Sequence, residues 1–161
     1  KAHTIRLLTA PDPSYSGSGT FLSDLDKGTT DFRAGSWLAW RRNPMEVLLQ
    51  YEKPVSIQSV TLSSLIHINS HIMPPLNVEI WGGEEQSSLQ LLGRITPEQP
   101  APVPKDSIGK LQPRLETFQC KFQPSTIQYI KIIGKPVPKM PSWHPAKGNM
   151  GYIFVDEILV N

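Results

Sequence analysis

The sequence predicts one all-β domain, an antiparallel sandwich of about eight strands. Proline supplies 16 of the 161 residues and clusters between extended segments rather than within them. Within those segments apolar residues alternate with polar ones, as they do in strands with one buried face. No stretch keeps an apolar period of about 3.6 residues, so we expect no helix beyond a short turn at 22–27.

In chain order, the expected strands are residues 4–9, 45–51, 55–66, 77–81, 89–95, 115–122, 127–134 and 152–160. Between Ile57 and Val60 the apolar phase shifts, which indicates a β-bulge. Residues 97–113 are rich in proline and are expected to form a surface loop with polyproline character.

Length and charge limit the classes of function. A chain of 161 residues fits a single domain, residues 1–161, and can bury a core. The net charge of +2 is small and scattered, so we expect neither nucleic acid as a partner nor membrane insertion. The start at Lys1 suggests a piece of a longer precursor. Cys120 is the only cysteine, which excludes an internal disulfide. Its alternation with Phe118 and Phe122 predicts a position in the core.

No set of residues predicts an enzyme. No serine lies in a nucleophile elbow, and no pair of carboxylates suits glycosidic acid–base chemistry. His67 and His71 lack a third ligand nearby for catalytic zinc. The stretch from Gly17 to Gly19 does not join a strand to a helix, so it is not a phosphate loop.

Several segments, taken in order, resemble one family. They are LSDLDKGTTDF at 22–32, WLAW at 37–40, the strand pattern of 47–60, IMPPLNVEI at 72–80 and IFVDEILV at 153–160. The order is similar to that of galactose-binding-like β-sandwiches, the factor V/VIII type C (discoidin) domains and family 32 carbohydrate-binding modules. It most resembles the discoidin-like domains that end bacterial β-hexosaminidase-type proteins. The resemblance implies a jelly-roll sandwich; Leu25 departs from it, standing where relatives usually have glycine.

Similar modules hold a structural calcium ion, and this resemblance implies one here. Calcium takes six to eight oxygen ligands, and the loop after residue 22 is rich in oxygen atoms. The expected ligands are carbonyls near Leu22 and Gly28, the side chains of Asp24 and Asp31, with Asp26 or Thr29 as further candidates, and Glu157 from the last strand. The alternative is a solvated acidic loop in which Asp24 caps a turn.

Sugar-binding modules of this kind use loops at one end of the sandwich, where His and Arg donate hydrogen bonds and an aromatic ring packs on the sugar. By loop position, the candidates are Trp40, Arg41, Arg42, His67, Asn69, His71, Trp143 and His144. Trp143 lies in a loop poor in other large apolar residues, which favours binding. Alternatively, Trp143 packs the loop between Pro141 and Pro145.

The resemblance therefore implies a non-catalytic module that binds glycan or polysaccharide. We expect it to be a C-terminal accessory domain of a larger exported bacterial protein that processes polysaccharide, located outside the cell, in the periplasm or at the cell surface. Its second partner would be the catalytic domain of the parent chain. The alternative is a structural or protein-interaction domain that packs against its parent enzyme and binds no sugar.

Overall fold

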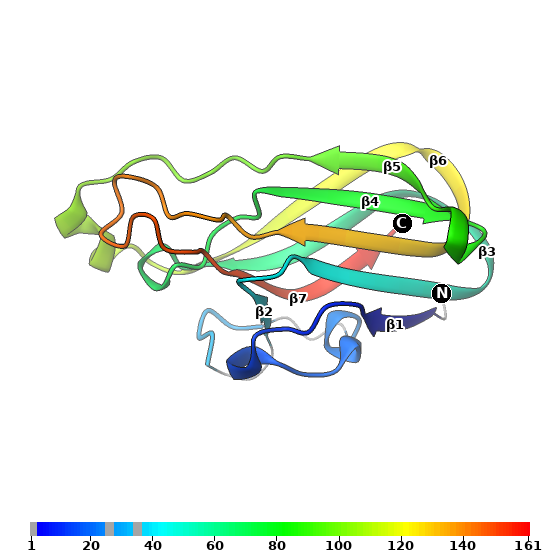
Figure 1. Ribbon diagram of the computed structural model, residues 1–161, viewed down its shortest axis with the longest axis horizontal. Helices are drawn as coiled ribbons and strands as arrows, with labels where there is room; N and C mark the ends of the chain where they lie inside the picture. Colours follow the sequence, from blue (N-terminus) through cyan, green and yellow to red (C-terminus); the bar gives the residue numbers. More distant parts are fainter. Residues whose placement is uncertain (1–2, 25–27, 34–36) are drawn as a thin grey trace.

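The structure is a computed structural model that describes residues 3–24, 28–33 and 37–161 (Figure 1). Its strands are β1 (His3–Leu7), β2 (Leu38–Trp40), β3 (Met45–Ile66), β4 (Asn77–Gly83), β5 (Gln90–Ile95), β6 (Arg114–Lys135) and β7 (Ile153–Val160). Short 3-10 turns join them: η1 (Pro13–Tyr15), η2 (Gly19–Leu22), η3 (Ile68–Ser70), η4 (Gln86–Ser88) and η5 (Lys105–Lys110). The all-β prediction is confirmed. In the described part of the chain, no helix is long and apolar enough to cross a membrane.

Two long strands, β3 and β6, take part in both layers of a sandwich. Residues 45–50 of β3 pair with β1 and with the end of β6, while residues 59–66 pair with the start of β6 and with β7. One layer therefore has the order β1-β3-β6-β4-β5 and the other β6-β3-β7-β2. All these pairings are antiparallel, as the sequence predicts.

Four of the expected strands are halves of β3 and β6. Each strand is 22 residues long and bends at an exposed proline, Pro54 or Pro124. Pairing of β3 with β6 is interrupted at both prolines, by register shifts between Gln50 and Val55 and between Ile57 and Ser59, and it resumes beyond each. The bulge predicted near Ile57 is confirmed by a shift of register between Ile57 and Ser59.

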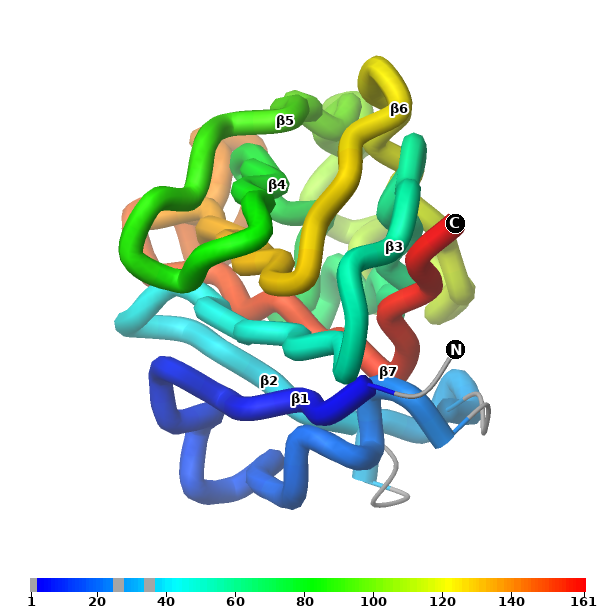
Figure 2. Tube along the Cα trace, turned by 90° about the vertical axis from the view of Figure 1, so that its right-hand side faces the viewer, coloured from blue at the N-terminus to red at the C-terminus, as the bar shows by residue number. Residues whose placement is uncertain are grey.

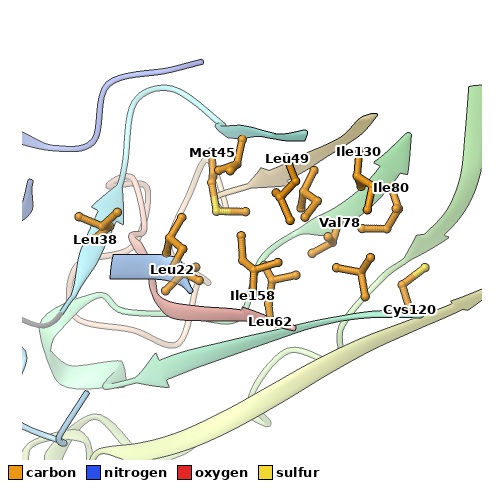
Figure 3. Packing of buried hydrophobic residues seen from close by; sticks show 14 of the residues in the cluster. Leu22, Leu38, Met45, Leu49, Leu62, Val78, Ile80, Cys120, Ile130 and Ile158 are labelled. Atoms are coloured by element: carbon orange, nitrogen blue, oxygen red, sulfur yellow. The ribbon is translucent and has the colours of Figure 1, made fainter. Parts of the chain in front are cut away.

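The main core fills the space between the layers (Figure 3). Met45 and Leu49 from β3 face Leu62 and Ile158 from the other layer, and all are at most 3% exposed. Cys120 belongs to this core, as predicted, and burial raises the pKa of its thiol.

The loops at one end of the sandwich have a smaller core of their own. Figure 1 shows the segments 67–76, 96–113 and 136–152 gathered at this end. The proline-rich segment lacks strands, as expected, but it is not merely a surface loop, since η5 inserts Ile108 (1% exposed) against Ile66, Met73 and Met140.

The N-terminal segment covers the outer face of the β7–β2 layer, as the blue tube in Figure 2 shows. Its Tyr15 and Phe32 pack against Trp37, Phe154 and their neighbours in a third cluster. A 3-10 turn lies at Gly19–Leu22, close to the turn expected at 22–27; Leu25, Asp26 and Lys27 lie outside the described residues.

Candidate functional site

Loops distant in sequence are tied together by backbone contacts at the loop end of the sandwich. The backbone carbonyl of Tyr152 accepts a hydrogen bond from the amide of Met73, and the amide of Tyr152 donates to the carbonyl of His71. The Nε of Arg41 donates to the carbonyl of Met150 at 3.2 Å. The segments 41–44, 67–76 and 136–152, which carry most of the predicted binding residues, therefore meet in space.

On this end lies a surface that we call the histidine–aromatic patch, made of Tyr15, Phe32, Arg41, His67, His71 and Tyr152. All six side chains are half-buried. Ring centroids of Phe32 and His67 are 5.7 Å apart, those of Tyr15 and Phe32 6.0 Å, and those of Tyr15 and Tyr152 6.1 Å.

Arg41 is held at the edge of the patch. Its guanidinium carbon lies 4.8 Å from the centre of the Tyr152 ring, a cation–π contact. The bond from Nε to Met150 fixes the guanidinium further. Arginine carries four more N–H donors on its terminal nitrogens, which suit the hydroxyl groups of a ligand.

His71 has a backbone conformation that is unusual for a residue with a side chain. It ends η3 with φ 65° in the left-handed region, and no other non-glycine residue in the described ranges has positive φ. This conformation costs about 1–2 kcal/mol for an ordinary residue. Backbone pairing between His67 and Ile72 and the bond to Tyr152 hold it in place. Such strain concentrates at binding sites.

The surroundings of both patch histidines lower the pKa of the imidazole and so favour its neutral form. Burial, and then the charge of Arg33, lowers the pKa of His67. Burial, followed by the charges of His144 and Arg41, lowers the pKa of His71. A neutral imidazole has one donor and one acceptor nitrogen, which matches the donor and acceptor roles of a sugar hydroxyl.

Two of the residues predicted to bind sugar, Trp40 and His144, lie inside the protein. Trp40 is 1% exposed and packs in the main core, where its indole N–H donates to the carbonyl of Thr9, so it presents no face to a sugar. His144 is 2% exposed and uses both ring nitrogens: Nδ1 accepts the amide of Ala146 and Nε2 donates to the carbonyl of Ile68. His144 instead supports His71, at a ring distance of 5.3 Å.

The other predicted residues lie outside the patch as defined here. Arg42 and Asn69 are exposed. Trp143 is half-buried against the small core of the loop end, which favours the loop-packing interpretation.

Sequence reasoning missed the aromatic residues of the patch. Tyr15, Phe32 and Tyr152 come from three separate segments, and only their position in polar loops or at a strand end hinted at a surface role. Trp37 supports Phe32 indirectly, because its indole N–H fixes the loop by donating to the carbonyl of Thr29 at 2.9 Å.

The two segments expected to hold calcium do meet. Gly28 donates its amide to Oδ2 of Asp156 at 2.5 Å. Opposite Ser63 and Ser64, β7 places Glu157 and Val155, so Asp156 is the extra residue of a bulge. The bulge explains why carboxylates interrupt the apolar alternation of the last strand. The side chains of Asp156 and Glu157 are both at most 2% exposed.

The residues expected to bind calcium differ in burial and in their distance from this junction. Glu157 lines a hollow of about 270 Å³ together with Ser23, the neighbour of Leu22 and Asp24 in sequence. Leu22 itself is fully buried and can offer only its carbonyl, while Asp24 is exposed. Asp31 is exposed and its Oδ1 accepts the amide of Arg33 within its own turn. Within the described ranges no group of three or more His, Cys, Asp or Glu side chains forms a metal cluster.

No protein-family model and no curated protein matches the chain. Solved structures do resemble it. A Clostridium perfringens module, CpGH89CBM32-5, in complex with GalNAc-β-1,3-galactose is 15% identical with a TM-score of 0.57, and the match covers 98% of this chain and 94% of that chain. The CBM32 of AlyQ in complex with 4,5-unsaturated mannuronic acid is 14% identical with a TM-score of 0.55, covering 98% and 93%.

A GH29 fucosidase of Ruminococcus gnavus in complex with fucose is 12% identical with a TM-score of 0.54; the match covers 98% of this chain and 25% of the fucosidase. The chain thus spans a quarter of the length of that enzyme. At these identities the likeness shows the fold: the chain has the β-sandwich fold of family 32 carbohydrate-binding modules.

Proposed function

We propose that the chain is a non-catalytic carbohydrate-binding module and that the histidine–aromatic patch is its binding surface. The observation that carries the proposal is the arrangement of three half-buried aromatic rings beside Arg41 and two histidines at the loop end. An aromatic face packs on the C–H face of a pyranose ring, while Arg and His bond its hydroxyls. The fold is shared with modules that bind sugars.

Binding of this kind is weak. A few hydrogen bonds and one stacked ring give dissociation constants of about a millimolar to a micromolar. The module would hold an attached catalytic domain close to polysaccharide, which raises the effective substrate concentration. The match to a quarter of the fucosidase supports an accessory position in a longer protein.

A second candidate is a domain that packs against its parent enzyme and binds no sugar. It is favoured by an apolar hollow of about 360 Å³ on the outer face of the first layer, lined by residues that include Leu48, Trp81 and Ile133. Exposed apolar surface of this kind suits contact with another protein.

A structural calcium ion near Glu157 is part of the proposal. The buried carboxylate of Glu157, the side chain of Asp24 and carbonyls near Leu22 and Gly28 supply the oxygen ligands that calcium prefers. Asp31 is left out, because its carboxylate serves its own turn. The ion would lock the first loop to the last strand. Melting should rise in calcium relative to EDTA, and Glu157→Gln should reduce that rise.

The test of sugar binding is a glycan-array screen of the domain, run in calcium and in EDTA, with Tyr152→Ala and Arg41→Ala. Each variant removes a contact of the patch and should lower binding at least about fivefold, the effect of about 1 kcal/mol. Tyr129→Ala is the matched control, because Tyr129 is half-buried near the Pro124 bend of β6, where it pairs with Gly83 at the end of β4 away from the loops. No binding by folded wild-type protein would favour the interaction domain, and equal binding by all variants would place the site elsewhere.

A further inference from the structure

Three loop segments of the binding end carry positive charge and contain no acidic residue. The segments 41–44, 67–76 and 135–152 contain Arg41, Arg42, Lys135, Lys139 and Lys147. None of the 14 acidic residues of the chain lies in them. Segment 96–113 at the same end adds Glu98 and Asp106 beside Lys105 and Lys110, and therefore no net charge. This end is cationic although the net charge of the whole chain is only +2.

Three of these cations line one groove. The groove has a volume of about 300 Å³, and its lining consists of Arg41, Arg42, Lys135 and the apolar side chains of Pro44, Leu76, Pro136, Pro138 and Met150. Arg42, Lys135 and Leu76 are exposed. The groove joins the histidine–aromatic patch directly, because Arg41 belongs to both and Met150 accepts its Nε–H.

In the described part of the chain, no carboxylate forms an ion pair with the cations of the groove. The ion pair found among the described residues is between Arg114 and Glu116, in β6. Asp12 lines an adjoining hollow with Arg41 and Arg42, and its Oδ1 accepts the amide of Ser14. The charges of Arg41, Arg42 and Lys135 are therefore available to a ligand.

We propose, building on the sugar-binding function proposed above, that the glycan bound here is anionic. One sugar ring lies on the histidine–aromatic patch, and the next residue of the glycan lies in the groove, with its carboxylate or sulfate between Arg41, Arg42 and Lys135. The apolar floor accepts the C–H face of that second ring. Guanidinium groups bind carboxylate and sulfate oxygens in a forked geometry, which gives specificity as well as charge.

The test compares oligosaccharides that differ only in charge. Trisaccharides of galacturonate, glucuronate, mannuronate and guluronate are titrated calorimetrically beside their carboxyl-reduced, neutral counterparts, and sulfated galactan fragments beside their desulfated forms. An exposed charge pair changes affinity about 1.5- to 5-fold, so three together should favour the acidic member by about 3- to 100-fold. The uronate and sulfate pairs distinguish the two anions.

Salt and substitutions localise the effect. The acidic preference should shrink between about 0.01 M and 0.15 M salt, where the Debye length falls from about 30 to 8 Å. Arg42→Ala and Lys135→Ala should each lower the ratio of acidic to neutral affinity about 2- to 5-fold. Lys53→Ala is the control, since it removes the same exposed charge about 30 Å further along β3 from Pro44. Its ratio should equal that of wild type.

The outcomes separate the two proposals. Neutral members that bind as tightly as their acidic partners, with a ratio unaffected by Arg42→Ala, would overturn the anionic class and leave the sugar-binding function standing. Absence of binding by every member, acidic and neutral, would overturn both.

Discussion

The contact between Gly28 and Asp156 tests how the first loop and the last strand are held together. Asp156 is 0% exposed and accepts the Gly28 amide across 128 residues of sequence. A hydrogen bond to a charged group contributes about 1.5–3 kcal/mol, and a buried amide left without its acceptor costs about 1 kcal/mol or more. We therefore expect Asp156→Ala to lower the free energy of unfolding by about 3 kcal/mol.

In a domain of this size 1 kcal/mol shifts the melting temperature by about 2–4 °C, so Asp156→Ala should lower it by about 6–12 °C. Asp156→Asn keeps an acceptor oxygen without the charge and should lose about half as much. Thermal melting and urea unfolding in EDTA measure both variants without a contribution from calcium. Asp31→Ala, an exposed carboxylate of the same loop, is the control and should stay within about 0.5 kcal/mol of wild type.

A melting temperature of Asp156→Ala within about 1 °C of wild type would refute this reasoning, because the lost bond would then contribute almost nothing. Equal losses in Asp156→Ala and Asp156→Asn would show instead that the charge, rather than the bond itself, carries the stability.

Three further predictions concern other parts of the domain. Gly28→Ala should cost about 1–3 kcal/mol in urea unfolding, because the added Cβ would overlap the Trp37 indole; wild-type stability would contradict it. Burial, and then neighbouring positive charge, lowers the folded-state pKa of His71, so the unfolded chain binds its proton more tightly. Melting temperature should fall as pH drops below about 6.5, less in His71→Gln than in wild type; parallel pH profiles would exclude this cause. Ile108→Ala should cost about 2–3 kcal/mol, and limited proteolysis should cut the 97–113 segment faster than in wild type; an unchanged rate would mean that Ile108 does not anchor the segment.

The fold class follows from the sequence because a period of two residues is a direct consequence of strand geometry. Strand continuity does not follow from it: Pro54 and Pro124 suggest breaks, yet β3 and β6 each run on past the proline and pair again beyond it. The strand β2 escapes prediction since all three of its residues are buried, which removes the alternation.

The site was partly predictable. The loop positions of Arg41, His67 and His71 follow from the family pattern, and the structure brings these residues to one surface. Burial of Trp40 could not be deduced, because both faces of β2 are covered: one by the main core and the other by the N-terminal segment. The partners Tyr15 and Tyr152 lie at opposite ends of the chain, so only tertiary structure places their rings 6.1 Å apart.

The two 22-residue strands have a consequence for how the domain folds. Since β3 and β6 each supply half of their length to either layer, neither layer can assemble completely while the other is absent. Their pairing also joins distant positions, such as Met45 with Gly134. Folding must therefore close a long loop before the central pairs form, which places the domain among slowly folding, highly cooperative β proteins. Both layers should form, and be lost, in a single transition.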